Sequence, residues 1–405
     1  MTAPRPRILF VSESFWPVLG GGETHIRDLA GRLVARGFGA HVLTRRTDPG
    51  WASRESAGGV EITRVGPVGP GRTKKYALAM RVLPALCRLA RGCDVLVVRG
   101  TRVLGLPGLL AGSWANRPVV LQPELNGELS GEVYTWGTAL HRSWPRRLVG
   151  ALVRVRNLFF RDAAAAVAMS RLIADEMARA GFPPERIAHI AHGVDTGRFS
   201  PRTPGEKAAL REGLGLPADG LVVTYTGRLL RGKGLEALLD AFARVAASEP
   251  RAHLMLVGSG AGQALSNEGD LRARVARMAL DGRVTFTGRV DAVEDCLGAS
   301  DVFAFPSEFE ALGLSLIEAA ACGLPCVGTR TGGIVDVIED GRTGLLVPPS
   351  DVHALAAALE ALLRDPERRS ALGARARARA VERFDVERSL DRYHALFHEL
   401  SSIRR

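Results

Sequence analysis

Short β-rich runs alternate with helical stretches along the whole chain, and this alternation constrains the fold more than any other feature of the sequence. In the first half, the runs with strand composition are 8–12, 40–44, 60–64, 95–98, 119–121, 165–169 and 187–191. In the second half, they are 221–226, 253–257, 284–286, 302–305, 326–328 and 344–347. Strands that alternate with helices predict parallel sheets covered by helices on both faces. The chain is therefore expected to be an α/β protein.

The length of the chain predicts two domains. A chain of 405 residues exceeds what one ordinary hydrophobic core accommodates. The two series of strands are separated by 195–220, a segment with prolines and glycines that indicates an interdomain linker. We expect one doubly wound domain over 1–198 and a second over 199–384. The simplest architecture is two such domains that face each other across a cleft.

Composition favours a soluble protein from a reducing compartment. Apolar residues make up 46% of the chain and charged residues 24%, which are the proportions of a soluble globular protein. The charge-free stretch 103–116 is shorter than the about 20 apolar residues that cross a bilayer, and no signal peptide is visible. The five cysteines are an odd number without metal-site spacing. We therefore expect a cytoplasmic location.

The excess positive charge of the chain lies in its first half. Residues 1–200 hold 28 Lys and Arg against 15 Asp and Glu, whereas the net charge of the whole chain is +11. Two segments, 72–93 and 142–161, each carry six basic residues and no acidic one. The second has apolar residues at helical spacing, which suits an anionic membrane surface, although a packing helix with a solvated arginine face is the alternative. No nucleic-acid-binding motif accompanies the charge, so nucleic acid is not an expected partner.

Two glutamates bracket the start of one predicted helix in the second half. Glu310 lies in a short loop after the strand at 302–305, and Glu318 lies inside the helix that opens near Gly313. The free amides and the dipole of a helix N-terminus favour a phosphate. Acids beside a bound phosphate can accept hydrogen bonds from hydroxyls on either side of it, as a nucleotide sugar requires. The alternative is a solvated loop glutamate and an ordinary helix glutamate.

The spacing of these two glutamates resembles the Glu-x7-Glu signature of the retaining, GT4-type glycosyltransferases (glycosyl transferases group 1), which have the GT-B fold. Glycines and prolines around the pair also fall where that family has them, at Pro306, Gly313, Gly323, Pro325, Gly332, Gly333, Gly341 and Pro348. The resemblance implies that Glu310 contacts hydroxyls of the donor sugar and that Glu318 contacts the nucleotide ribose. It also implies that main-chain amides at Leu312, Gly313 and Leu314 meet the diphosphate.

Two basic residues follow the first strand of the second series. Arg228 and Lys233 stand five residues apart in a glycine-containing strand-to-helix turn. An arginine fork and a lysine point charge in such a turn suit a diphosphate. The element resembles the family's Gly-Arg…Lys-Gly motif, which implies that both side chains stabilise the departing diphosphate. The alternative for Lys233 is that it caps a loop.

Further donor contacts follow from the resemblance. Gly21 and Gly22 lie in a glycine run between the first strand and its helix, without the spacing of a dinucleotide-binding fingerprint. Glycines let a backbone approach a ligand closely, and the family's first-domain glycine loop closes over the donor diphosphate or sugar. A flexible surface turn is the alternative. Arg289 and Val290 match the region where family members contact the nucleobase through main chain.

The chain departs from the family in two places. The family often has Gly-Phe-Gly after the first glutamate, whereas this chain has Ala-Leu-Gly at 311–313, which leaves the donor sugar open. Many relatives carry a histidine near the donor sugar after the strand at 119–121, whereas here Glu124 stands closest to that position and Glu128 follows. We expect Glu124 to orient a hydroxyl. For Glu128, a role in the site and a plain loop both stay open.

Taken together, the resemblance implies a GT-B fold with two Rossmann-like domains. The domain at 1–198 would bind the acceptor, the domain at 199–384 the nucleotide sugar, and a last helix at 385–405 would cross back to the first domain. No Asp-x-Asp motif appears, so we expect neither a metal nor another cofactor. Catalysis is expected to depend on Glu310, Arg228, Lys233 and Glu124.

The function implied by the resemblance is hexosyl transfer with retention, from a nucleotide-diphosphate sugar to a glycan, a lipid-linked or a small-molecule acceptor. Synthesis of cell-surface polysaccharide or glycolipid would suit a protein that is cytoplasmic or peripheral on the inner face of the plasma membrane. Two alternatives remain, because a fold alone does not fix the reaction. One is a nucleotide-sugar epimerase-like enzyme, and the other is a non-catalytic nucleotide-sugar-binding partner.

Overall fold

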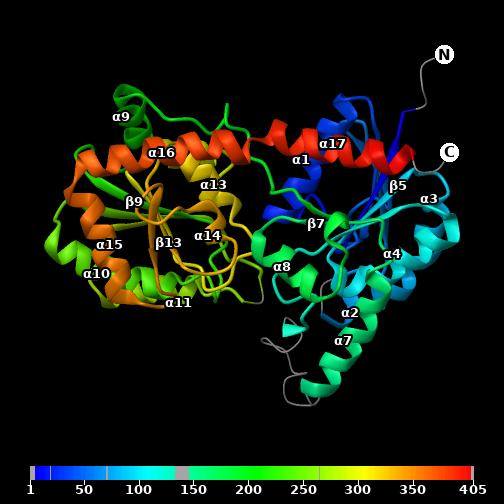
Figure 1. Ribbon diagram of the computed structural model, residues 1–405. Helices are drawn as coiled ribbons and strands as arrows, with labels where there is room; N and C mark the ends of the chain where they lie inside the picture. Colours follow the sequence, from blue (N-terminus) through cyan, green and yellow to red (C-terminus); the bar gives the residue numbers. More distant parts are fainter. Residues whose placement is uncertain (1–4, 19, 70–71, 133–145, 264, 403–405) are drawn as a thin grey trace. The chain divides into compact units, whose positions relative to one another are not determined.

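The computed structural model describes residues 5–18, 20–69, 72–132, 146–263 and 265–402, so 142–145 of the second basic segment lie outside the described residues (Figure 1). The chain divides into two compact units. The first unit extends to Ala191 and resumes at Ser389, and the second comprises His192–Arg388. The acceptor-binding and donor-binding roles of the two domains stay predictions.

Eight strands form one sheet in the described part of the first unit, in the order β3-β4-β2-β1-β5-β6-β7-β8. They are β1 (Arg7–Ser12), β2 (Gly39–Arg45), β3 (Arg54–Ala57), β4 (Val60–Val65), β5 (Val95–Arg99), β6 (Val119–Gln122), β7 (Ala165–Ala168) and β8 (Ile187–His189). Neighbours pair in parallel, except that β3 pairs antiparallel with β4. The sequence did not predict β3, because its residues are exposed or half-buried and lack an apolar alternation.

Helices pack on both faces of this sheet. They are α1 (Gly21–Ala35), α2 (Arg72–Arg81), α3 (Leu83–Ala90), α4 (Thr101–Ala115), α7 (Arg146–Phe160) and α8 (Arg171–Arg179), with a 3-10 turn at Pro184–Arg186. Val97 of β5 faces a core that also contains Leu29 of α1. The neighbouring Val98 faces the opposite side, where a Cβ on Gly108 of α4 would lie only 2.3 Å from its side chain. Alternate residues of the strand therefore support different helix layers.

The last helix, α17 (Val386–Ser402), contributes most of its length to the first unit. Its buried residues Leu390, Tyr393, Phe397 and Leu400 recur at helical spacing and join the core of that unit. The ring of Phe397 packs edge-on against Phe10 of β1, with 6.3 Å between the centroids. The first unit is thus completed by a segment that follows the whole of the second unit in the sequence.

Six parallel strands form the sheet in the described part of the second unit, in the order β11-β10-β9-β12-β13-β14. They are β9 (Leu221–Thr226), β10 (Ala252–Val257), β11 (Val284–Gly288), β12 (Val302–Phe305), β13 (Cys326–Thr329) and β14 (Gly344–Val347). The helices are α9 (Pro204–Gly213), α10 (Leu235–Ser248), α11 (Glu268–Arg277), α12 (Val293–Gly298), α13 (Leu314–Ala321), α14 (Ile334–Val337), α15 (Val352–Arg364) and α16 (Pro366–Phe384). This strand order is that of a Rossmann fold, with a reversal between β9 and β12.

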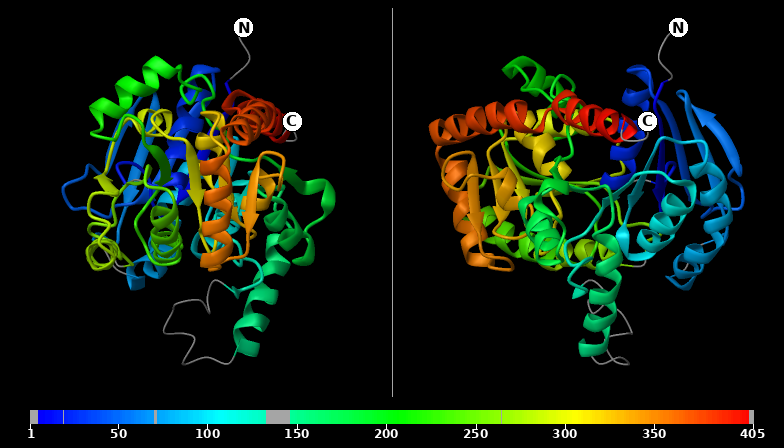
Figure 2. Two further views of the ribbon diagram at one scale, coloured as in Figure 1. Left: turned by 90° about the vertical axis from the view of Figure 1, so that its left-hand side faces the viewer. Right: turned by 45° about the vertical axis from the view of Figure 1, so that its right-hand side comes forward.

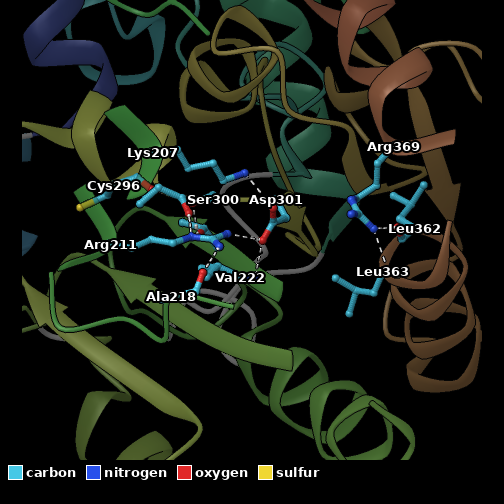
Figure 3. A network of polar contacts seen from close by, with 12 residues as sticks. Lys207, Arg211, Ala218, Val222, Cys296, Ser300, Asp301, Leu362, Leu363 and Arg369 are labelled. Carbon is cyan, nitrogen blue, oxygen red and sulfur yellow. Dashed lines mark hydrogen bonds and ion pairs between the residues drawn. The ribbon is translucent and has the colours of Figure 1, made fainter. Parts of the chain in front are cut away.

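The predicted linker contains α9, which is bound to the second unit (Figure 3). The carboxylate of Asp301 accepts hydrogen bonds from Lys207 Nζ at 2.7 Å and from Arg211 Nη2 at 2.6 Å. The same carboxylate accepts a bond from the amide of Val222 at the start of β9, at 2.7 Å. The linker prediction was therefore wrong for this stretch, because ion pairs with distant residues fix a helix that has few apolar residues of its own.

In the first unit, α7 extends beyond the layers of the sheet and the other helices in all three views (Figure 2). Its inner side is anchored, for instance where Phe160 packs so closely on Gly105 of α4 that a Cβ there would lie 2.4 Å from the ring. Among the described residues, no helix combines the length and the apolar character needed to cross a membrane.

Candidate active site

The strand order of the second unit reverses between β9 and β12, and in open α/β sheets ligands bind outside the carboxyl ends of the strands at such a switch point. Arg228 and Lys233 lie in the turn that follows β9, and Glu310 lies in the loop that follows β12. The three residues predicted for sugar and diphosphate contacts thus come from the two loops that flank the reversal.

Lys233 and Glu310 are in direct contact. Lys233 Nζ donates a hydrogen bond to Glu310 Oε2 at 2.8 Å, and the two side chains remain 23% and 19% exposed. The contact requires close approach of the two loops, which a glycine permits. Gly234 has a φ of 68°, and a Cβ at this position would lie 2.0 Å from the carbonyl oxygen of Pro306. A side chain on Gly234 would therefore push apart the loops that carry the pair.

Tyr225 supports the neighbouring Arg228. Its buried hydroxyl donates a hydrogen bond to the Arg228 carbonyl oxygen at 3.2 Å. Burial raises the pKa of Tyr225, the charge of Glu310 raises it further, and Arg228 lowers it. The tyrosine therefore stays protonated and fixes the backbone of Arg228. The guanidinium itself is exposed, and its Nη1 donates to Gln263 Oε1 at 3.5 Å.

The predicted phosphate-binding helix is α13. It begins after Gly313, which has a φ of 93°. Since glycine has no side chain that could cap the helix, no capping side chain at this position covers the first amides. Leu312 is buried, Leu314 is half-buried, and Glu318 is a half-buried residue one turn further along. The loop ahead of the helix is held because the amide of Gly333 donates to the Glu310 carbonyl oxygen at 3.0 Å.

The predicted nucleobase contacts lie elsewhere in the second unit. Arg289 and Val290 follow β11, which β10 separates from β9. The Arg289 side chain is 67% exposed, and its Nη2 lies 3.9 Å from Asp291 Oδ1. These two residues are therefore not part of the Lys233–Glu310 contact, and their role stays a prediction.

Two buried hydroxyls at this edge of the sheet were not singled out from the sequence. Thr226 ends β9, and Ser307 follows β12. Both side chains are buried, and neither hydroxyl has a hydrogen-bond partner within the described residues. Because buried polar groups are normally hydrogen-bonded, these hydroxyls are candidates for contacts to a ligand or to water. Ser307 follows Pro306 of the family pattern, and Thr226 directly precedes the turn that carries Arg228, so both hydroxyls lie next to predicted site residues.

The first unit has its own reversal of strand order, between β1 and β5. Here the structure brings together Gly22, Arg99 and Glu124. Arg99 ends β5 and is only 1% exposed. Its Nη1 donates to the Gly22 carbonyl oxygen at 2.7 Å, and its Nη2 lies 3.4 Å from Glu124 Oε1. Gly21, the other predicted glycine, is exposed at the start of α1.

The environment of Glu124 changes its acidity. Burial among neighbouring protein atoms raises the pKa of Glu124 to about 7, and the positive charge of Arg99 opposes this rise. The carboxylates of Glu128, Glu23 and Glu13 raise the pKa further. The Glu124 side chain nevertheless keeps 33% of its surface exposed, so its carboxyl group is accessible. A carboxyl group of this kind can exchange a proton near neutral pH.

Glu128 is buried, and both of its carboxylate oxygens are bound. One oxygen accepts from the amide and the hydroxyl of Thr101 at 2.8 and 2.7 Å, at the start of α4. The other accepts from the amides of Glu124 and Leu125, both at 3.2 Å. The structure therefore gives Glu128 a supporting role, in which it fixes the loop that carries Glu124.

Solved structures with the same architecture define the class of fold. A sucrose-phosphate synthase from Thermosynechococcus elongatus matches with a TM-score of 0.83 and 25% identity, over 98% of this chain and 100% of that one. Anabaena Alr3699/HepE in complex with UDP-glucose matches with a TM-score of 0.76 and 24% identity, over 97% and 99% of the two chains. The fold is GT-B, as the sequence predicted.

Sequence comparisons then define the family. Residues 20–193 match the glycosyl transferase 4-like domain, and 206–379 match the glycosyl transferases group 1. The D-inositol 3-phosphate glycosyltransferase of Kineococcus radiotolerans is 31% identical over 392 residues, which cover 89% of this chain and 86% of that protein. The chain belongs to the glycosyl transferases group 1.

Another relative aligns over a shorter stretch. The GDP-mannose-dependent monoacylated alpha-(1-6)-phosphatidylinositol monomannoside mannosyltransferase of Corynebacterium glutamicum is 38% identical over 201 residues, which cover 47% of this chain. The matched stretch covers 50% of the length of this relative, and 47% of the length of the D-inositol 3-phosphate glycosyltransferase of Rhodococcus jostii. This chain therefore spans about half the length of these two relatives.

Proposed function

We propose that this protein is a retaining glycosyltransferase that moves a sugar from a nucleotide-diphosphate sugar to an acceptor hydroxyl. The observation that carries the proposal is the Lys233–Glu310 contact at the switch point of the second unit, beside an uncapped helix N-terminus. Membership of the glycosyl transferases group 1 supports the reaction class. Synthesis of a glycolipid or of a cell-surface polysaccharide is the proposed setting.

The donor would be held chiefly by the second unit. Arg228 and Lys233 supply two cations for the diphosphate, and the first amides of α13, near Leu312, Gly313 and Leu314, supply hydrogen-bond donors. A phosphate oxygen at Lys233 would share its ammonium group with Glu310, and the Glu310 carboxylate would accept a hydrogen bond from a sugar hydroxyl.

The remaining donor contacts are proposed by similarity to the family. Glu318 would accept a hydrogen bond from the ribose, and the main chain of Arg289 and Val290 would meet the nucleobase. The backbone at Gly21 and Gly22 would approach the diphosphate or sugar. Glu124 would orient a hydroxyl.

The reaction needs no protein base in this proposal. The bond between the anomeric carbon and the diphosphate oxygen breaks, and the acceptor oxygen forms its bond on the same face of the sugar. The acceptor proton passes to the departing phosphate oxygen. Arg228, Lys233 and the α13 amides stabilise the charge that develops on the leaving group, so we propose that no metal is required. Transfer should therefore persist after treatment with EDTA.

Incubation with labelled UDP-, GDP- and ADP-sugars, with and without lipid extract, tests the reaction. UDP-glucose and GDP-mannose are the first donors to test, because the structure of HepE was solved with UDP-glucose and the corynebacterial relative is GDP-mannose-dependent. Acceptor-dependent nucleotide release supports transfer, and the anomeric configuration of the product tests retention. A changed free sugar would instead indicate an epimerase-like enzyme, and binding without turnover a non-catalytic partner.

Glu310→Gln tests the residue on which the proposal depends. The neutral amide loses the ion pair with Lys233 and accepts hydrogen bonds more weakly, so turnover should fall at least tenfold while the protein stays folded. Glu308→Gln, in the same loop and also half-buried, is the matched control and should retain turnover. Equal turnover in the wild type and in Glu310→Gln would refute the assignment.

A membrane surface is the proposed partner of α7. Leu152, Val155 and Phe159 recur along one side of the helix and are 53%, 54% and 56% exposed. Arg154 and Arg161 are exposed as well. Apolar residues flanked by arginines suit a surface of anionic lipid. The protein would then be peripheral on the inner face of the plasma membrane.

The basic segment 72–93 lies near a second set of exposed apolar residues, on α4. Leu106, Leu110 and Trp114 recur one turn apart and are 40%, 62% and 53% exposed. The guanidinium of Arg91 stacks over the ring of Trp114, 4.0 Å from its centroid. This pairing places a basic group of the segment beside the apolar side chains of α4.

Vesicle flotation tests the membrane proposal. The wild type should float with phosphatidylglycerol vesicles at low salt, and less at high salt or with phosphatidylcholine alone. Leu152→Gln combined with Phe159→Gln should reduce flotation. Leu265→Gln changes an exposed leucine of the second unit and should leave flotation unaltered. Absence of salt-sensitive flotation in the wild type would remove the proposal.

A further inference from the structure

We propose that Arg99 is a positioning residue that holds the carboxylate of Glu124 ready to accept a hydrogen bond from a substrate hydroxyl. The inference rests on the proposed transfer reaction and adds a residue that neither the sequence patterns nor the comparisons assign. It places a hydroxyl-binding site at the switch point of the first unit.

The position of Arg99 in the fold supports this role. The residue ends β5, which pairs with β1 on one side and with β6 on the other. The carboxyl ends of β1 and β5 lie at the reversal of strand order, where open α/β sheets bind ligands. The glycine run follows β1, and Glu124 follows β6. Arg99 is thus the charged side chain that joins the two loops.

The contacts of Arg99 fix the geometry on both sides. Its Nη1 is committed to the Gly22 carbonyl oxygen at 2.7 Å, in the first turn of α1. Its Nη2 lies 3.4 Å from Glu124 Oε1, an ion pair without a hydrogen bond. A Cβ on Gly22 would lie 3.5 Å from Nη2 and 3.6 Å from Glu124 Oε1, so a larger residue at this position would approach both members of the ion pair.

The carboxylate of Glu124 differs from that of the neighbouring Glu128 in what it binds. Glu128 is buried, and both of its oxygens accept hydrogen bonds from Thr101 and from loop amides. Glu124 keeps 33% of its side chain exposed, and Arg99 is its ion-pair partner in the described part of the chain. Glu128 is therefore occupied in holding the loop, whereas the oxygens of Glu124 remain able to accept a bond from a hydroxyl.

The charges around Glu124 explain why an arginine is needed there. Glu128, Glu23 and Glu13 are like charges that disfavour the ionised carboxylate, and burial acts in the same direction. Arg99 is the group that lowers the pKa of Glu124 against these effects. Without Arg99, the equilibrium at neutral pH would shift further toward the protonated carboxyl group, which presents a donor in place of an acceptor.

Titration of the full-length chain labelled with 13C-glutamate tests the inference without any turnover. The Glu124 carboxyl signal is the one that disappears in Glu124→Gln. In the wild type it should titrate near pH 7, well above an ordinary glutamate at about 4.3. In Arg99→Met the midpoint should rise by about one pH unit or more. An unchanged midpoint in Arg99→Met would overturn the inference.

Two further variants separate positioning from general destabilisation. Arg64→Met removes another arginine of the first unit, which is also buried, and should leave the Glu124 midpoint unchanged. Arg99→Lys keeps the charge but cannot form the arginine fork between the Gly22 carbonyl and Glu124, so its midpoint should lie between those of the wild type and Arg99→Met. If Arg99→Met does not fold, Arg99→Lys alone tests the inference. A Glu124 midpoint in Arg99→Lys equal to that of the wild type would refute the positioning role of Arg99.

Turnover measurements distinguish this inference from the proposed function. With the donor and acceptor that give turnover, Arg99→Met should raise the KM of the substrate whose hydroxyl Glu124 binds at least tenfold at pH 7 and change the KM of the other substrate less than twofold. Equal effects on both would contradict a role confined to the hydroxyl. If the wild type transfers no sugar from any donor, the proposed function is refuted. The titration still tests whether Arg99 controls the protonation of Glu124.

Discussion

Replacement of Gly234 by alanine perturbs the contact on which the site of the second unit depends. Gly234 precedes α10, directly after Lys233, and its backbone lies against the carbonyl group of Pro306 in the loop that leads to Glu310. Any Cβ at this position must either overlap that carbonyl or push the two loops apart. Gly234→Ala should therefore affect both the stability of the second unit and its ability to hold a donor.

The expected magnitude has two parts. The φ of 68° costs alanine about 1–2 kcal/mol, because L side chains are strained in the left-handed region. The Cβ would lie 2.0 Å from the Pro306 oxygen, and an overlap that the surroundings must relieve costs about 1–3 kcal/mol. Together these terms amount to about 2–5 kcal/mol, which for a unit of this size lowers Tm on the order of 10 °C.

Gly215→Ala is the matched control, because Gly215 has a φ of 64° but no atom within 4 Å of the added Cβ. It should show only the backbone cost of about 1–2 kcal/mol. Thermal unfolding followed by circular dichroism measures both variants, and titration with UDP and GDP measures the site. If Gly234→Ala were no less stable than Gly215→Ala and bound nucleotide like the wild type, the close approach of the two loops would not support the site.

Two further predictions concern the glutamates after β6. Glu128→Gln should lower the free energy of unfolding by about 1–3 kcal/mol, because it weakens the buried hydrogen bonds to Thr101. Glu185→Gln, at an exposed position, should leave the free energy of unfolding unchanged, and urea unfolding of both variants measures the difference. The folded state binds the Glu124 proton more tightly than the unfolded chain, so stability should fall as pH rises from 4.5 to about 7. The expected fall in the free energy of unfolding is on the order of 1–2 kcal/mol, after allowance for the exposed third of the side chain. If the same fall persisted in Glu124→Gln, the raised pKa would not belong to Glu124.

The architecture could be predicted from the sequence because the central strands are buried on both faces. All residues of β5 and β9 are buried, and the apolar runs 95–98 and 221–223 with which they begin stand out between helical stretches. The edge strand β3 and the helix α9 were missed for the opposite reason. Their few apolar residues leave no pattern, and pairing with β4 or with Asp301 decides their structure.

The second-unit site was visible in the sequence because its residues lie in short local patterns. Arg228 and Lys233 share one turn, and Glu310 stands beside the glycines of its loop. Arg99 gave no such signal, because its role depends on Gly22, which lies 77 residues away, and on a loop that follows another strand. Long-range contacts of this kind follow from the strand order and are not contained in any local pattern.

Titration of the protein with UDP and GDP measures whether Arg228 and Lys233 hold the diphosphate of the donor. Arg228→Met and Lys233→Met should each weaken the binding of at least one nucleotide about tenfold or more, since a hydrogen bond to a charged group contributes about 1.5–3 kcal/mol. Arg231→Met is the matched control, because Arg231 lies between them in the sequence, is 67% exposed and pairs with Asp270. Arg231→Met should therefore bind both nucleotides like the wild type. Equal affinities in all three variants would refute the role of Arg228 and Lys233 in holding the diphosphate.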